Sequence, residues 1–193
     1  LQSLLDDHYK INYRDPYIGE ESADDYFLTQ NVWERQDEYS RNRYVWHEKQ
    51  VVPPYALNQG NNWSEGYDRI YIANVVLENV DLANADNPDK SEHENIKGQA
   101  LFLRGKTLLQ LAWIWCLAFD SASAQTDLGL PLRMTSDFNV KVNRSSLQST
   151  YGQIIKDLTL ATTMLPDIPK HPMRASKAAA FGYLARTYLS IRD

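Results

Sequence analysis

The chain of 193 residues has a net charge of −5, with 20 Lys and Arg against 25 Asp and Glu. This balance argues against a general nucleic-acid-binding protein, because neutralising phosphates requires a basic face. A hydrophobic fraction of 43% and a charged fraction of 23% are ordinary for a globular protein, and the single cysteine, Cys116, excludes an internal disulfide.

The first predicted element is a short helix over residues 1–13, where apolar side chains recur at roughly helical spacing and Ser3 is available as the N-cap. Pro16 and Gly19 then interrupt the pattern. An acidic patch follows, made of Glu20, Glu21, Asp24 and Asp25. The patch lacks the alternating-ligand and glycine spacing of a calcium loop, so we interpret it as a solvated turn rather than a cation site.

Residues 26–62 are aromatic and polar without a clear period, and Pro53 and Pro54 favour extended backbone, so we predict a mostly irregular segment. Ordering such a segment costs conformational entropy, which indicates packing on a scaffold or a binding role. Aromatic faces beside planar hydrogen-bonding side chains suit a ligand such as a sugar ring, although the same rings would also fill space between the loop and the helices. The candidate stacking faces are Trp46, Tyr44 and Tyr55, and the candidate hydrogen-bonding partners are Arg43, Asn42 and Asn58.

A second helix is predicted from about Trp63, with Ser64 as its N-cap and the turn-forming residues 84–88 as its end. One stripe of this helix carries Trp63, Tyr67, Ile70, Asn74 and Leu77. We interpret Asn74 on that stripe as a buried amide with satisfied hydrogen bonds rather than as a ligand contact.

A long helix is predicted from Ser91 to Phe119, and we expect the other elements to pack against it. Ser91 and Glu94 have the spacing of a capping box. From Leu108 onward only Gln110 interrupts an apolar run, so this half is expected to be covered on most sides. A membrane span is the competing interpretation, but the run is shorter than the roughly 18 residues that a span needs. We therefore predict a buried helix.

The remaining sequence predicts a loop and two more helices. Residues 120–142 are rich in Ser, Asp, Gly and Pro, which indicates a surface excursion. The most regular helix follows, with Ser145 and Gln148 as a second capping box and Pro166 at its end. The last helix begins near Ser176 and carries small side chains on one stripe, which permits close approach of a neighbouring helix. That stripe holds Ala178, Phe181, Gly182, Ala185 and Leu189.

The four later helices form two hairpins that resemble each other in sequence. The matching residues are Tyr67 and Tyr151, Ile70 and Ile154, Lys97 and Lys177, Ala100 and Ala180, and Thr107 and Thr187. Helix, turn and helix with small residues on the second helix is the tetratricopeptide pattern, here separated by insertions rather than tiled. We therefore predict an all-α fold of tetratricopeptide-like helical hairpins with long irregular insertions.

The sequence carries no catalytic signature with the required spacing. The four histidines are far apart, no HExxH or CxxC motif occurs, and neither a phosphate-cradling glycine pair nor a nucleophile elbow is present. We therefore predict no catalytic residue, no metal site and no cofactor, and a protein that is not an enzyme. A helical glycosidase stays open as an alternative, because it needs only two carboxylates about 5 to 10 Å apart.

Five sequence runs stand in a distinctive order. They are WSEGYDRIYIANVVLENV (63–80), KGQALFLRGKTLLQLAWIW (97–115), GLPL (129–132), RSSLQSTYGQIIKDLTLATTMLP (144–166) and RASKAAAFGYLARTYLSIRD (174–193). In this order the runs resemble the N-terminal half of the SusD/RagB-like family of outer-membrane nutrient-binding lipoproteins. The resemblance covers essentially the whole chain, with minor departures such as Gly105, where the family often has alanine.

The resemblance implies a helical protein at the cell surface, tethered to the outer membrane by an N-terminal lipid and seated on a TonB-dependent, SusC-like transporter. The family captures oligosaccharides, or sometimes peptides, and hands them to that channel without chemistry. Residues 1–193 are then expected to be the N-terminal helical domain, without the lipidated N-terminus and the C-terminal half. The leading hypothesis is a glycan-binding component of an importer, and the alternative is a tetratricopeptide-like interaction scaffold that binds no sugar.

Overall fold

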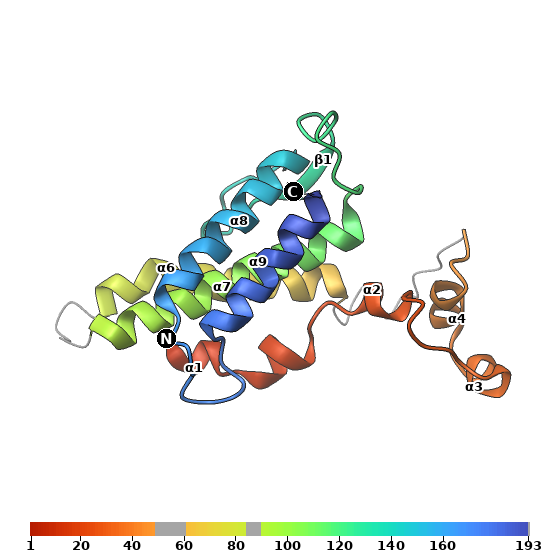
Figure 1. Ribbon diagram of the computed structural model, residues 1–193, viewed down its shortest axis with the longest axis horizontal. Coiled ribbons are helices and arrows are strands. Elements are labelled where there is room, and N and C mark those ends of the chain that lie inside the picture. The colour runs from red at the N-terminus through yellow and green to blue at the C-terminus, as the bar shows by residue number, and fades with distance from the viewer. Residues whose placement is uncertain (49–60, 84–89, 193) are drawn as a thin grey trace.

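The computed structural model describes residues 1–48, 61–83 and 90–192 of the chain. Long helices dominate these ranges, with short helical turns near the N-terminus and two short strands (Figure 1). In chain order the elements are α1 (Gln2–Leu5), the π-helix η1 (Tyr9–Tyr13), α2 (Ile18–Glu21), α3 (Gln30–Glu34), α4 (Glu38–Tyr44), α6 (Asn62–Ala83), α7 (Lys90–Trp115), β1 (Leu128–Pro131), β2 (Arg144–Ser146), α8 (Leu147–Met164) and α9 (Lys177–Ile191).

Helix α7 is the central element, because it packs against α6 on one side and α8 on the other (Figure 1). Helix α9 packs on α8, so the long helices form two pairs, α6 with α7 and α8 with α9. Fully buried aliphatic side chains fill the space between the pairs, among them Ile70, Leu108, Leu111, Ile154 and Leu158. This arrangement confirms the predicted all-α fold of tetratricopeptide-like hairpins.

The two helical pairs bury equivalent positions, as their matching sequences predict. Ala100 of α7 and Ala180 of α9 are both fully buried, and so are Thr107 and Thr187, two turns further along the same face of each helix. The matching lysines each pair with an aspartate, Lys97 with Asp81 at 3.3 Å and Lys177 with Asp167 at 3.5 Å. The repeat seen in the sequence is therefore a repeat of packing.

The stripe of small side chains predicted on the last helix lies on the exposed face of α9. Phe181 is 54% exposed and Leu189 is 77% exposed, and an added Cβ at Gly182 would meet no atom within 4 Å. The residues of α9 that are fully buried are instead Ala180 and Thr187. Close packing through that stripe does not occur within the described part of the chain.

Polar side chains begin three of the long helices. Helix α9 begins at the predicted place, and Ser176 is its N-cap, since its side chain accepts a hydrogen bond from the backbone N–H of Ala179. Ser146 caps α8 in place of the predicted Ser145. Asn61 caps α6, and the prediction of Ser64 is wrong because the Asn61 Oδ1 atom accepts hydrogen bonds from the backbone N–H groups of residues 63 and 64, at 3.0 Å each.

Helix α7 is shifted relative to its predicted bounds. The helix already includes Lys90, so Ser91 lies in its first turn rather than at the N-cap, and the helix ends at Trp115 instead of Phe119. The apolar run within it is mostly buried, but Trp113 is 41% exposed and its indole N–H donates to a serine hydroxyl of α9 at 3.0 Å. No helix in the described ranges has the length and apolar character needed to cross a membrane.

The N-terminal segment lies against the long helices, and the single helix predicted for residues 1–13 is split into α1 and η1. Leu5 packs into a cluster with buried residues of α6 and α7. Asp6 accepts two hydrogen bonds from the Arg174 guanidinium, at 2.9 and 2.6 Å. These bonds tie the segment to the turn between α8 and α9, and they hold the pKa of the Asp6 carboxyl below its usual value.

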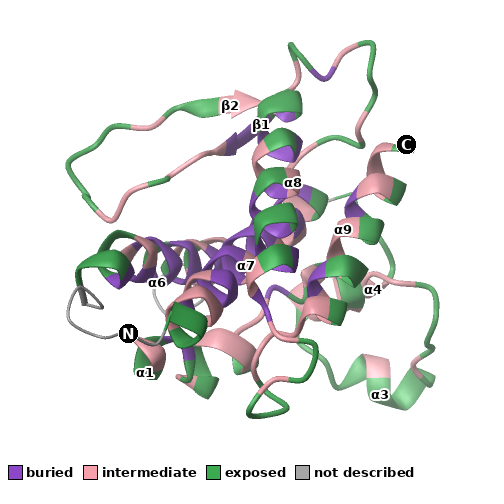
Figure 2. Cartoon of the chain, turned by 60° about the vertical axis from the view of Figure 1, so that its left-hand side comes forward, coloured by how far each residue is buried: buried purple, intermediate pink, exposed green. Residues whose placement is uncertain are grey.

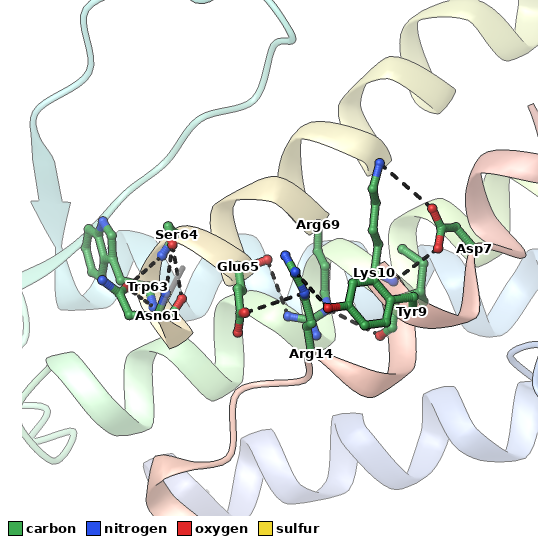
Figure 3. Close-up of polar contacts among 10 residues, drawn as sticks. Asp7, Tyr9, Lys10, Arg14, Asn61, Trp63, Ser64, Glu65 and Arg69 are labelled. Carbon is green, nitrogen blue, oxygen red and sulfur yellow. Dashed lines mark hydrogen bonds and ion pairs between the residues drawn. The ribbon is translucent and has the colours of Figure 1, made fainter. Parts of the chain in front are cut away.

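A second tie joins the end of this segment to the start of α6. Figure 3 shows Arg14 between Tyr9, whose hydroxyl accepts a hydrogen bond at 2.9 Å, and Glu65, whose carboxylate lies 3.7 Å away. The buried Arg69 Nε donates to the carbonyl of Ile11 at 3.2 Å. The chain is therefore anchored on α6 before it continues into α2.

One short strand, β1, interrupts the loop predicted over residues 120–142, so that part of the prediction is wrong, and a second strand, β2, follows the predicted loop. β1 pairs antiparallel with β2, and Figure 2 shows their connection, residues 132–143, extending over α6. The backbone N–H of Leu130 donates to the Thr150 hydroxyl of α8 at 3.0 Å. Gly129 permits this close approach, because a Cβ there would lie 2.2 Å from that hydroxyl and 2.5 Å from the Ser146 carbonyl oxygen. The strands thereby fix both ends of the connection to α8.

Candidate functional site

The sequence-predicted site residues that the structure describes lie together on one arm, made of residues 18–48 with α2, α3 and α4. Figure 1 shows α3 and α4 standing out from the long helices. The described candidates are Asn42, Arg43 and Tyr44 on α4, and Trp46 just after it. Tyr55 and Asn58 lie outside the described residues.

Trp46 presents an open aromatic ring at the end of α4. Its ring is 73% exposed, while its indole N–H donates to the Ser22 carbonyl at 2.7 Å. Its φ of 52° lies in the left-handed region, which residues other than glycine adopt infrequently. The side chain is thus fixed at its nitrogen with its faces available, an arrangement suited to stacking against an apolar ligand face.

Tyr44 is held more deeply than Trp46. Its ring packs against that of Tyr26 with centroids 5.7 Å apart, and its hydroxyl accepts a hydrogen bond from the backbone N–H of Leu28 at 2.9 Å. These contacts fold the chain between α2 and α3 back onto α4. Tyr44 therefore supports the arm and leaves only part of its ring for a ligand.

Arg43 is committed to contacts inside the arm. It is 6% exposed, forms an ion pair with Glu21 and lies 3.8 Å above the Tyr39 ring. Burial raises the pKa of the Glu21 carboxyl, and the positive charge of Arg43 opposes that rise. The interpretation of the acidic patch as a wholly solvated turn is therefore wrong at Glu21, which attaches α2 to α4. The neighbouring Asn42 accepts a backbone hydrogen bond at its carbonyl from His47, at 2.8 Å.

A groove of about 480 Å³ lies between α6 and residues 132–143, and we call it the α6 groove. Helix α6 contributes Trp63, Tyr67 and Tyr71 at successive turns of one face. The ring centroids of Trp63 and Tyr67 are 4.9 Å apart, and Tyr71 stacks on Phe138 of the connection at 4.9 Å with 26° between the planes. Aromatic side chains from both walls therefore line this groove.

Several polar side chains lie among these rings, and Asp68, Arg133 and Tyr67 are three of them. Asp68 is exposed, and no hydrogen bond or ion pair joins its carboxylate to the rest of the described chain. Arg133 donates to the Val140 carbonyl at 3.3 Å, within its own wall of the groove. The Tyr67 hydroxyl donates to the Pro131 carbonyl at 2.9 Å, and burial raises its pKa, so it stays a neutral donor. Asp68 therefore offers the groove an acceptor that no hydrogen bond of the described chain occupies.

A buried polar network supports the wall formed by residues 132–143. The Asn74 amide donates to the carbonyls of Arg133 and Thr135, at 3.0 and 3.2 Å, and accepts from Arg104 at 2.8 Å. Arg104 in turn donates twice to Asp157, at 2.7 and 2.9 Å. The network joins α6, α7 and α8 to the groove. It confirms that Asn74 is a satisfied buried amide.

Glu78 provides a second attachment for the same wall. Its carboxylate accepts a hydrogen bond from the Ser136 backbone N–H at 2.8 Å and another from the Ser136 hydroxyl. These bonds lower the pKa of the Glu78 carboxyl. Sequence reasoning placed Trp63 and Tyr67 on an apolar stripe and missed the groove. The signal that marks it is the spacing of Trp63, Tyr67 and Tyr71, with an acid beside them.

The single thiol offers little reactivity. Cys116 is half-buried at the end of α7, and burial raises its pKa, which keeps it protonated and a poor nucleophile. Among the described residues no group of three or more His, Cys, Asp or Glu side chains is arranged to hold a metal ion. What the arm and the α6 groove provide is contact surface with aromatic faces.

Comparisons with known proteins show a family match over nearly the whole chain. The SusD-like family model, described as "Starch-binding associating with outer membrane", matches residues 1–189. None of the curated proteins compared with the chain matches it.

Three solved structures illustrate the likeness. A putative sugar binding protein from Bacteroides vulgatus ATCC 8482 is 28% identical, with a TM-score of 0.67 over 79% of this chain and 33% of that one. A SusD superfamily protein from Bacteroides thetaiotaomicron VPI-5482 is 22% identical, with a TM-score of 0.74 over 99% of this chain and 42% of that one. A laminarin binding SusD-like protein is 18% identical, with a TM-score of 0.68 over 97% and 39%. The chain thus spans less than half the length of these solved chains.

Proposed function

Because this chain belongs to the SusD-like family, we propose that it is the carbohydrate-binding component of a nutrient import system at the outer membrane. The match of the family model to residues 1–189 carries the proposal, and two of the similar solved proteins are themselves described as sugar binding or laminarin binding. In this role the protein, lipid-anchored at the cell surface, captures an oligosaccharide. It delivers the sugar unchanged to a TonB-dependent, SusC-like transporter.

The arm gives this proposal a physical contact point. Trp46 combines a ring that is 73% exposed with an indole nitrogen already bonded to the Ser22 carbonyl. A sugar ring has an apolar C–H face, so it stacks on such a side chain without first having to displace an internal contact. Tyr44 and Arg43 position Trp46 by packing α4 against the rest of the arm, and Asn42 is the nearby amide proposed to bond a hydroxyl group.

Replacement of Trp46 by alanine tests the arm. We expect Trp46→Ala to weaken binding of an oligosaccharide about tenfold, because the lost stacking face is worth about 1.4 kcal/mol. The measurement is isothermal titration of the full chain with α-glucan and laminarin oligosaccharides.

Phe27→Ala is the matched control, since Phe27 is an aromatic residue of the same arm and is 81% exposed. Its binding constant should equal that of the unchanged protein. If both variants bind alike, Trp46 is not a ligand contact. If the unchanged protein binds no oligosaccharide at all, the proposed function itself is wrong.

A tetratricopeptide-like interaction scaffold that binds no sugar is the second candidate, and the exposed apolar stripe of α9 favours it. Phe181 and Leu189 lie on that stripe in the open, where an apolar partner surface would cover them. Under this alternative, Leu189→Lys abolishes association with the purified TonB-dependent transporter while no oligosaccharide binds. Under the leading proposal, oligosaccharide binding is measurable and Leu189→Lys leaves it unchanged.

A further inference from the structure

The α6 groove shares no residue with the arm and has its own set of aromatic and polar groups. We propose that this groove is a separate saccharide-binding site, formed by α6 and residues 132–143. The class of ligand rests on the proposed function, but the site itself rests on the geometry of the groove. The groove would thus bind a second sugar unit or a second segment of the same polysaccharide.

The dimensions of the groove fit a small organic ligand. Its volume of about 480 Å³ lies within the range of roughly 300–1,000 Å³ usual for such sites. Its aromatic faces come from two directions, with Trp63 and Tyr71 on α6 and Phe138 on the opposing connection. A ligand with an apolar face can therefore lie against Trp63 and the stacked Tyr71–Phe138 pair, which joins the two walls.

The rings at the open side of the groove are exposed. Phe138 is 72% exposed and Tyr71 is 38% exposed, although the two stack on each other. An exposed apolar cluster bordered by polar side chains marks an interaction site more often than a single exposed aromatic residue does. The stacked pair supplies the platform against which the apolar face of a sugar would lie.

The polar groups favour a neutral, hydroxyl-bearing ligand. Asp68 is an uncommitted carboxylate beside the rings, and an ionised carboxylate only accepts hydrogen bonds, which hydroxyl groups donate. Near Asp68 the same negative charge opposes a phosphate or carboxylate ligand, while the guanidinium of Arg133 is already hydrogen-bonded to the Val140 carbonyl of its own wall. Sugar hydroxyls can donate hydrogen bonds to the Asp68 carboxylate while the C–H face of the sugar ring packs against Tyr71.

The wall opposite α6 is already in place. The Asn74 amide donates to the carbonyls of Arg133 and Thr135. The Glu78 carboxylate accepts from the backbone N–H of Ser136. Because these bonds fix residues 132–143 before a ligand arrives, little conformational entropy remains to be lost on binding. A fixed wall that carries a stacked ring pair therefore lowers the entropic cost of binding a sugar.

Two substitutions in the groove test the site by titration of the full chain with maltoheptaose and laminarihexaose. Tyr71→Ala removes one stacking face, and we expect about tenfold weaker binding. Asp68→Asn keeps the shape and removes only the charged acceptor, and we expect about five- to tenfold weaker binding. Because Asp68 makes no hydrogen bond within the described chain, this second variant should fold as the unchanged protein does.

Leu82→Ala is the matched control, because Leu82 is a 75% exposed residue of α6 outside the groove. Binding that is weakened by both groove variants, but not by Leu82→Ala, supports the site. The double variant Asp68→Asn with Trp46→Ala tests whether the groove and the arm contribute to oligosaccharide binding separately. If the unchanged protein binds an oligosaccharide and both groove variants bind it equally well, the groove is not a saccharide site, while the proposed function stands. If neither sugar binds to the unchanged protein, both proposals are wrong.

Discussion

Replacement of Asp157 by alanine is expected to lower the free energy of unfolding by about 3–5 kcal/mol. Asp157 is 1% exposed and Arg104 is 7% exposed, and two hydrogen bonds of 2.7 and 2.9 Å join them. Removing the carboxylate leaves a buried guanidinium without its counter-charge, which costs more than the intact pair contributes. The Gln153 amide, which donates to Asp157 at 2.8 Å, loses its acceptor as well.

Urea denaturation of the two proteins measures this difference, provided that the slopes of the unfolding transitions agree. Asp81→Ala is the matched control, since Asp81 also pairs with a basic side chain, Lys97, but its own side chain is 63% exposed. We expect that change to cost only about 0–1 kcal/mol. If both changes lower the free energy of unfolding equally, burial does not determine how much the Asp157–Arg104 pair contributes to stability.

Gly129→Ala is expected to cost at least about 3 kcal/mol, at the upper end of the overpacking range. The added Cβ would lie 2.5 Å from the Ser146 carbonyl oxygen, which belongs to backbone and cannot rotate away, and 2.2 Å from the Thr150 hydroxyl. Strand β1 must therefore move off α8, which also breaks the hydrogen bond from Leu130 to Thr150. For a chain of this size the midpoint of thermal unfolding should fall by about 6–12 °C.

Gly152→Ala provides the opposite control on the adjoining helix. An added Cβ at Gly152 would meet no atom within 4 Å, and alanine favours the helix, so we expect α8 to gain about 0.5–1 kcal/mol. Calorimetry of both variants distinguishes the two effects. If the Gly129→Ala protein has the same midpoint of thermal unfolding as the unchanged protein, β1 is not packed on α8 as described.

The helical pairs could be predicted because their signals are local. Apolar residues at helical spacing mark α8, and α9 begins directly after Ser176, near where the sequence places its start. The cap of α6 was missed because Asn61 and Ser64 both have side chains that can cap a helix, and only the backbone geometry selects between them.

The groove could not be predicted, because its contacts join distant residues. Phe138 gains a role only when residues 132–143 fold back onto Tyr71, and that fold depends on Asn74, which lies 59 residues from Arg133 in sequence. The pairing of β1 with β2 is hidden in the same way, since strands of four and three residues carry too little pattern to stand out from a loop. For the arm, composition alone indicated exposed aromatics, but it could not show that Arg43 pairs with Glu21.

The bond between Asp6 and Arg174 has a consequence for the order of folding. Its two partners lie 168 residues apart, whereas the long helices mostly contact their neighbours in sequence. At about 5–20 residues per second, a ribosome needs roughly 10–30 s to make the intervening chain. During that interval Asp6 lacks Arg174, so this tie can close only after α6, α7 and α8 have been made, whereas the contacts of the N-terminal segment with α6 can form earlier. Hydrogen exchange of ribosome-bound chains of increasing length would detect this as protection of the Asp6 amide, which donates to Gln2, only once Arg174 has been made.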